Sequence, residues 1–401
     1  MPPEENLFVE ERPVSLEELT SDGQGSGLEI ERGNNPEGAI RAPFDPAQID
    51  VVTQVRTVDL LLARLREGEL DLSPDFQRRA NIWDHRRKSS LIESILLRIP
   101  IPSFYVSEDK HGNYTVVDGL QRLCAIAHFA DVHALNKAVK TKLDSLRLIG
   151  LQSFDYNNKS FAELPRPLQR RISETELTVH VIRASTPRDV KFNIFSRINQ
   201  GGLPLTAQEI RNAVYDGEWR KKVRQLAESD IFIGATDHKI KGERMEDIEL
   251  VLRFVAHYTF NAERPDDQNL EEFLNETVEK RSARWNEKQW EEISAAFYRA
   301  LNAAPKVFGR HAFRKYFGPN EPRNPINRGL FETETVVLAR RSSEELKLLA
   351  LRSELVLQKL AQLFEGDTDF NRALLYATGR GSSSNKRIEI MSEALTEVLN
   401  A

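Results

Sequence analysis

The chain has 401 residues, of which 40% are hydrophobic and 29% charged, with a net charge of −5. This composition is typical of a soluble globular protein, and the length predicts more than one domain. No apolar run approaches the roughly 20 residues that span a bilayer, and the N-terminus lacks a signal-peptide pattern. The single cysteine, Cys124, excludes an intrachain disulfide framework and a cysteine metal cluster. We therefore expect a cytoplasmic protein with no membrane partner.

The first 50 residues are strongly acidic. Twelve acidic residues stand against three arginines in this segment, a net charge of −9, so the rest of the chain carries +4. Glycine and proline recur and apolar periodicity is weak, as in chains that do not bury a core. We predict a flexible acidic segment over residues 1–50. A second hypothesis is that this segment competes with an anionic ligand for a basic groove.

Two predicted helices flank a polar stretch that contains Gln77 and Arg78. Capping residues and apolar spacing place the helices at residues 57–68 and 84–98. The second helix carries a basic run that we expect to face outward: Arg86, Arg87 and Lys88. Such charges usually form only a solvated helix face, but beside an aromatic residue they also suit a polyanion such as DNA.

The chain is organised around residues 114–122, Tyr-Thr-Val-Val-Asp-Gly-Leu-Gln-Arg. Residues 103–107 and 114–118 have the pattern of a β-hairpin, and an apolar helical pattern runs from Leu120 to Ala130. The sequence therefore predicts a strand, a tight turn and the start of a helix.

Asp118 and Gly119 occupy this predicted turn, and Gln121 and Arg122 lie in the first turn of the helix. The N–H groups and dipole of a helix N-terminus favour an anion, and an arginine adds a bidentate donor for phosphate. The alternative is a structural turn in which Asp118 caps the helix and Arg122 pairs with a surface carboxylate. These residues alone leave both interpretations open.

A second polar corner follows the next predicted strand, residues 177–182. We interpret His180 in that strand as a packed or edge residue, because no other histidine or cysteine has metal-ligand spacing to it. A helix over residues 188–198 then leads into two glycines, with Arg197 and Asn199 beside them. These side chains suit a second phosphate or base contact, although asparagine is common at helix ends for conformational reasons.

The C-terminal half is predicted to be α-helical. Apolar residues recur at helical spacing in five segments: 245–260, 270–282, 287–303, 332–341 and 344–364. We interpret their apolar stripes as core. The serine-rich basic segment 378–387 is interpreted as a loop between helices, and phosphate binding at the following helix N-terminus is the weaker alternative.

Three motifs occur in an order that resembles the N-terminal domain of GmrSD-type restriction enzymes: Phe76-Gln77-Arg78, Asp118-Gly119-Leu120-Gln121-Arg122, and Arg197-Ile198-Asn199 before two glycines. The resemblance covers roughly residues 50–215. It implies an α+β fold with a small mixed sheet and helices, similar to ParB and sulfiredoxin. We accordingly expect an acidic segment over 1–50, a nucleotide-binding domain over 51–215 and an α-helical domain over 216–401.

The resemblance also assigns roles to the matching positions. The implied catalytic residues are Asp118, Gln121 and Arg122, and the implied nucleotide or phosphate contacts are Gln77, Arg78, Gly119, Arg197 and Asn199. Asp118 would bind Mg²⁺, the expected cofactor, or orient a water molecule. Leu120 departs from the family, which usually has glutamine there, and this puts hydrolysis in doubt more than binding. Cys124 lies outside the position of the sulfiredoxin nucleophile, so we interpret it as a small buried apolar residue.

The resemblance implies a nucleotide-binding, NTP-hydrolysing component of a bacterial restriction system, with a nucleoside triphosphate and DNA as partners. Many relatives carry a C-terminal nuclease of the His-Asn-His type, and the sequence of residues 216–401 lacks that motif, so a separate nuclease subunit is expected. The alternative is a non-catalytic DNA-binding or nuclease-recruiting module that senses a nucleotide or a modified base. Direct DNA cleavage ranks last, because the sequence has no recognisable metal-carboxylate cluster.

Overall fold

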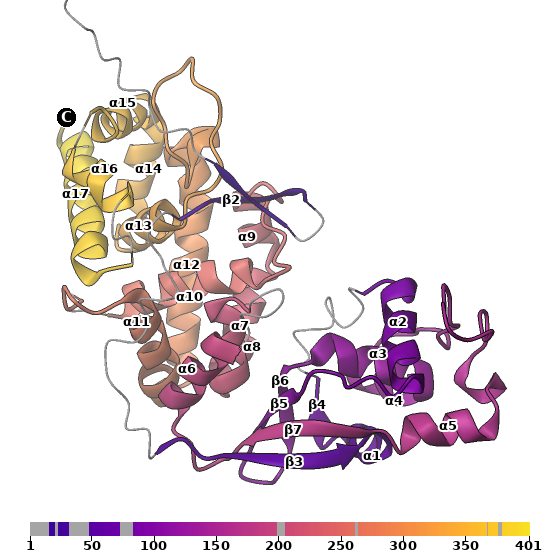
Figure 1. The fold of residues 1–401 in the computed structure, drawn as a ribbon. Coiled ribbons are helices and arrows are strands. Elements are labelled where there is room, and N and C mark those ends of the chain that lie inside the picture. Colours follow the sequence, from indigo (N-terminus) through magenta and orange to yellow (C-terminus); the bar gives the residue numbers. More distant parts are fainter. Residues whose placement is uncertain are drawn as a thin grey trace, which may run out of the picture. The chain divides into compact units, whose positions relative to one another are not determined.

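The computed structural model describes residues 16–20, 23–31, 48–72, 83–198, 205–260, 264–366, 368–375 and 379–401. It divides into two compact units (Figure 1): residues 40–216, the mixed unit, and residues 1–39 together with 217–401, the helical unit. The expected α+β class with a helical C-terminal region is confirmed. In the described part of the chain, every helix is too short or too polar to span a membrane.

The mixed unit is built on a five-stranded sheet with the order β3-β7-β5-β6-β4. The pairs β3–β7 and β5–β6 are antiparallel, whereas β5–β7 and β4–β6 are parallel. The strands are β3 (Val51–Thr57), β4 (Leu70–Asp71), β5 (Phe104–Glu108), β6 (Tyr114–Asp118) and β7 (Glu176–Ile182). The predicted hairpin of β5 and β6 and the predicted strand at β7 are therefore present.

Helices pack against one face of this sheet and form the core of the unit with it. The helices are α1 (Val58–Glu67), α2 (His85–Leu96), α3 (Leu120–Ala130), α4 (Val132–Val139) and α5 (Arg166–Ser173). Alternate strand residues such as Phe104, Val106 and Val179 point into this core. The predicted limits of α1 are confirmed, since the Thr57 side chain caps it and Gly68 ends it with a φ of 78°.

Two further helices complete the mixed unit, α6 (Arg188–Ile198) and α7 (Ala207–Val214). Helix α7 begins with the predicted capping box, in which Thr206 and Glu209 bond reciprocally. Lys191 on α6 donates to the backbone oxygen of Glu108, at the C-terminal end of β5, over 3.3 Å. This hydrogen bond joins α6 to the C-terminal end of β5.

The helical unit is organised around α13 (Arg328–Ala339), all twelve residues of which are buried. The helices that follow α7 in the chain are α8 (Glu218–Ala227), α9 (Asp230–Ala235), α10 (Glu246–Thr259), α11 (Leu270–Glu276) and α12 (Glu287–Val307), and those that follow α13 are α14 (Ser343–Leu351), α15 (Ser353–Leu363), α16 (Asp369–Leu375) and α17 (Gly381–Asn400). Helices α10, α12 and α17 pack against α13. The helical character predicted for this half is confirmed.

One segment predicted as a single helix, residues 344–364, is instead two helices that meet at Arg352. The guanidinium of Arg352 donates to the backbone oxygens of Val398 and Leu399, near the C-terminal end of α17. Because these acceptors are far along the chain, apolar spacing within the segment could not reveal the break.

The N-terminal segment contributes two paired strands to the helical unit, β1 (Glu17–Leu19) and β2 (Gly25–Glu29). Strand β2 extends this pairing through a parallel bridge between Leu28 and Ile326. Three acids of the segment form ion pairs with cations of the unit: Glu18 with Arg328, Glu29 with Lys315, and Glu31 with Arg253. The described part of residues 1–50 is therefore structured, in contrast to the flexible segment that composition suggested, because its charges neutralise buried cations.

Candidate functional site

The predicted strand, turn and helix are present around Asp118. Strand β6 ends at Asp118, Gly119 follows with a φ of 95°, and α3 begins at Leu120. A Cβ atom on residue 119 would lie 2.4 Å from the Phe104 ring, closer than any real contact. The position therefore requires glycine for two reasons, the left-handed backbone conformation and the close approach of the ring.

Arg122 binds groups of the protein itself. Its Nη2 donates to Asp118 Oδ2 over 2.7 Å, and its Nη1 donates to the backbone oxygens of Pro102 and Ser103. The guanidinium lies over the Phe104 ring, 4.9 Å from the centroid, and its side chain is only 13% exposed. Of the two interpretations left open by the sequence, this geometry matches pairing of Arg122 with a carboxylate, here that of Asp118.

The N-terminus of α3 has no capping side chain. The N-cap residue is Gly119, which has no side chain that could accept a hydrogen bond from the first turn. The first helical hydrogen bond runs from the Leu123 N–H to the Gly119 oxygen. Asp118 therefore does not cap the helix as the structural alternative supposed; its side chain is 36% exposed and contacts Arg122 through Oδ2. An open helix N-terminus beside a half-exposed carboxylate suits an anion that arrives with a cation.

The loop that Arg122 holds also borders an open groove of about 620 Å³. Ile101, next to Pro102, is one of the lining residues. The others come from the end of α2 and the loop that follows it, from α5 and the turn that follows it, and from the start of β7. Three arginines line it: Arg98, Arg170 and Arg171. A continuous stretch of backbone thus connects the Asp118 corner with a concave, arginine-lined surface.

The two other predicted corners are only partly visible. Gln77, Arg78 and Asn199 lie outside the described residues. Arg197 is exposed near the C-terminal end of α6, and among the described residues no hydrogen bond or ion pair connects it with Asp118 or Arg122. The proposed contribution of these residues to the same pocket stays a prediction.

The expectation that the basic run on α2 faces outward is correct for Arg86 and Arg87 but wrong for Lys88. Arg86 and Arg87 are exposed, and Arg87 lies over the Trp83 ring at 4.4 Å. Lys88 is 1% exposed, its Nζ lies 3.1 Å from His128 Nδ1, and burial lowers its pKa. The reason is helical spacing, since Lys88 shares a face with Ile92, four residues on, which is fully buried.

Cys124 is fully buried in the core of the mixed unit, and burial raises the pKa of its thiol to about 12. A thiol that stays protonated is a poor nucleophile. The interpretation of Cys124 as a small buried apolar residue is confirmed.

Sequence reasoning missed an aromatic pair near this corner. The rings of Tyr105 on β5 and His180 on β7 stack with centroids 4.5 Å apart, and His180 Nδ1 lies 2.9 Å from Thr53 Oγ1. His180 was correctly interpreted as a packed residue, but Tyr105 was not singled out. The available signal was strand alternation, because Val179 and Val181 point into the core and His180 between them must point to the opposite face.

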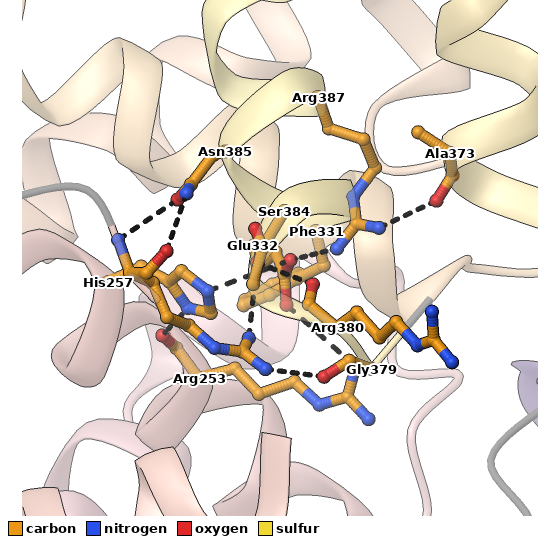
Figure 2. A network of polar contacts seen from close by, with 12 residues as sticks. Arg253, His257, Phe331, Glu332, Ala373, Gly379, Arg380, Ser384, Asn385 and Arg387 are labelled. Atoms are coloured by element: carbon orange, nitrogen blue, oxygen red, sulfur yellow. Dashed lines mark hydrogen bonds and ion pairs between the residues drawn. The ribbon is translucent and has the colours of Figure 1, made fainter. Parts of the chain in front are cut away.

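The helical unit contains a buried polar network centred on Glu332 (Figure 2). Glu332 is 1% exposed; it accepts a hydrogen bond from Arg387 and lies within 4.0 Å of both Arg253 and His257. Burial lowers the pKa of His257 to about 4, so the imidazole is neutral near pH 7. The network stabilises packing between α10, α13 and α17 and has the character of a structural core.

The serine-rich basic segment 378–387 was expected to be a loop, but α17 begins within it, at Gly381. Ser384 joins the segment to the buried polar groups, since its Oγ accepts a hydrogen bond from Arg264. The N–H groups of Gly381 and Ser382 donate to the backbone oxygens of Gln268 and Asp266. A Cβ atom on residue 381 would lie 1.9 Å from the Pro265 oxygen, so the two backbones are in close contact. The loop interpretation is therefore wrong for residues 381–387, which are helical. The first N–H groups of α17 bond to the protein's own carbonyls, so this helix start is not open for a phosphate.

Residues 60–215 match the N-terminal domain of the GmrSD restriction endonuclease. The resemblance inferred from the three motifs is thereby confirmed for this part of the chain. No curated protein and no solved structure gives a match.

Proposed function

We propose that the mixed unit binds a nucleoside triphosphate at the corner formed by β6 and α3, as the nucleotide-dependent component of a DNA restriction system. The observation that carries this proposal is the uncapped N-terminus of α3 beside the half-exposed carboxylate of Asp118. Backbone N–H groups at such a terminus bind phosphate without a side chain. The match of residues 60–215 to a restriction-endonuclease domain supports the system in which this binding operates.

Mg²⁺ would enter this site together with the phosphates. Among the described residues, no three His, Cys, Asp or Glu side chains are grouped to hold a metal ion. Mg²⁺ is usually held by one or two carboxylates and by substrate phosphates, so one carboxylate, Asp118, fits that pattern. The cation would neutralise charge on the phosphates, and Asp118 would orient it or a water molecule.

Arg122 would act by positioning. Its bonds to Asp118, Pro102 and Ser103 hold the carboxylate and the loop before β5 in a fixed relation to the first turn of α3. Preorganised groups lose less entropy on binding. Gln121, also in that turn, completes the set of motif side chains at the corner, while Gln77, Arg78, Arg197 and Asn199 are proposed to close it.

A non-catalytic sensor of a nucleotide or modified base is the second candidate function. Two observations favour it: Leu120 replaces a polar motif residue, and Arg122, which would stabilise charge in a phosphoryl-transfer transition state, is instead bound by Asp118 and two carbonyls. Phosphoryl transfer depends on such charge stabilisation. A separate nuclease subunit would then recognise the ligand-bound form of this chain.

Isothermal titration calorimetry with ATP, GTP and CTP in the presence of Mg²⁺ tests the binding proposal. We expect at least one nucleotide to bind, and Asp118→Asn to weaken its Mg²⁺-dependent binding, whereas Asp155→Asn, an exposed acid of the same unit, serves as the control. Phosphate release with and without DNA separates hydrolysis from sensing. Failure of all three nucleotides to bind would refute the proposal.

A further inference from the structure

A row of side chains crosses the sheet of the mixed unit and ends at the proposed nucleotide corner. Strand register places Thr53 of β3 opposite His180 of β7, His180 opposite Tyr105 of β5, and Tyr105 opposite Asp118 of β6. The register of the β5–β6 pair shifts between Tyr105 and Val106, which marks a β-bulge beside Asp118. Bulges re-aim a side chain at the end of a strand, and they are frequent next to binding sites.

The aromatic members of the row lie on the sheet face opposite the helical core. Their strand neighbours Phe104 and Val106 are buried in that core, whereas Tyr105 and His180 are only half-buried and Thr53 is exposed. A nucleotide site needs one group of residues for the phosphates and another for the base. The helix N-terminus at Asp118 suits the phosphates, and a solvent-accessible pair of rings beside it suits the base.

We propose that Tyr105 and His180 form the base-binding part of the nucleotide site, so that the phosphates lie at the start of α3 and the base stacks on the aromatic pair. This assignment rests on the proposed function of the Asp118 corner. In the strand order, Tyr105 lies between His180 and Asp118, and its ring stacks on the imidazole with the centroids 4.5 Å apart. A base that stacks on Tyr105 extends this aromatic pair toward Asp118, the neighbour of Tyr105 on β6.

The pair is held in place before any ligand binds. Thr53 Oγ1 fixes one imidazole nitrogen of His180 at 2.9 Å, and the stacked imidazole in turn limits rotation of the Tyr105 ring. A preformed surface costs little side-chain entropy on binding. Because every base has an aromatic face, stacking provides affinity for the base without selecting its identity.

The experiment compares two ligands, the nucleoside triphosphate that binds most tightly and inorganic triphosphate, both with Mg²⁺ in calorimetry on the full chain. Base stacking on an aromatic side chain contributes about 1–3 kcal/mol, so Tyr105→Leu is expected to weaken nucleotide binding about 5- to 150-fold. The affinity for inorganic triphosphate should stay unchanged, because that ligand has no base. Tyr105→Phe keeps the ring and should bind both ligands as the wild type does.

His180→Ala provides a second test that leaves Tyr105 in place. We expect a smaller loss of nucleotide affinity, again without a loss for inorganic triphosphate. Tyr156→Ala is the matched control, since Tyr156 also belongs to a stacked, half-buried pair of the mixed unit, with Phe154. Melting temperatures of all variants show whether each one is folded at the temperature of the titration.

The outcomes separate the two proposals. Equal losses for both ligands, or unchanged nucleotide binding in folded Tyr105→Leu and His180→Ala, would overturn the base-binding assignment while leaving the Asp118 corner intact. If the wild type binds inorganic triphosphate and nucleotide with equal affinity, the base makes no contact and the assignment also fails. If the wild type binds neither ligand, the proposed function and this inference fail together.

Discussion

Replacing Glu31 by glutamine should destabilise the helical unit strongly. Both oxygens of Glu31 accept hydrogen bonds of 2.8 Å from Arg253, whose side chain is 3% exposed. Burial opposes ionisation of Glu31, but attraction to Arg253 outweighs it and lowers the pKa from 4.5 to about 2. Such a difference corresponds to about 3 kcal/mol of folding free energy at neutral pH. For a unit of this size, the melting temperature should fall by about 6–12 °C.

The same pair predicts the pH dependence. Because the folded-state pKa of Glu31 is below its unfolded value, its contribution is complete above pH 4.5 and is lost as the pH falls toward 2. The stability difference between the wild type and Glu31→Gln should therefore be largest near neutrality and should shrink through this acid range. Arg253 keeps a second partner, Glu249, at 2.6 Å, so the variant is expected to fold.

Urea unfolding monitored by tryptophan fluorescence measures this effect. In a Trp83→Phe background all remaining tryptophans belong to the helical unit, and Trp219 and Trp290 are buried there. Glu393→Gln, an exposed acid on α17, is the matched control. If Glu31→Gln shifts the unfolding free energy no more than Glu393→Gln does, the N-terminal segment is not a structural part of this unit.

Three further predictions concern the mixed unit. Gly119→Ala should cost about 1–3 kcal/mol in unfolding free energy, because the backbone is left-handed and the added Cβ meets a ring at 2.4 Å; a circular-dichroism midpoint equal to that of the wild type would refute this. Arg122→Ala should weaken nucleotide binding roughly ten- to a hundredfold, because it releases the Asp118 carboxylate and the loop at Pro102 and Ser103. Arg122→Lys should restore binding only in part, since one ammonium group cannot replace the several donors of a guanidinium. Unchanged calorimetric affinity in Arg122→Ala would remove Arg122 from the site. Replacing Arg86 and Arg87 by alanine should lower DNA affinity and flatten its dependence on salt, whereas Lys88→Ala should lower the melting temperature and leave the salt dependence intact; equal salt slopes in all variants would exclude this surface from DNA binding.

Local signals in the sequence were sufficient for several elements. The caps of α1 and α7 and the turn at Gly119 depend on residues a few positions apart, and each is present as predicted. Helices α4 and α5 were not predicted, because they are short and lie in a polar, proline-containing stretch. The charge of Lys88 predicts exposure, but its place on the buried face of α2 decides its position.

The parts of the site that escaped prediction depend on contacts between distant strands. The partners of Arg122 include backbone oxygens of Pro102 and Ser103, and a backbone oxygen has no sequence signature. The stacking of Tyr105 on His180 requires β5 and β7 to be neighbours in parallel, although 67 residues lie between the end of one and the start of the other. Pairing at such separation follows from topology rather than from residue type.

The ion pair between Glu18 and Arg328 spans 310 positions of the chain, and Glu29 and Lys315 are 286 apart. The mixed unit is thus inserted into the sequence of the helical unit. Strands β1 and β2 of the helical unit are synthesised long before Lys315 and Arg328, the cations that they bind. At a translation rate of about 5–20 residues per second, roughly 15–60 s pass between synthesis of the glutamates of β1 and β2 and synthesis of the cations that neutralise them. During synthesis the inserted unit can fold first, and the helical unit closes around β1 and β2 only after residues 315–328 have been made.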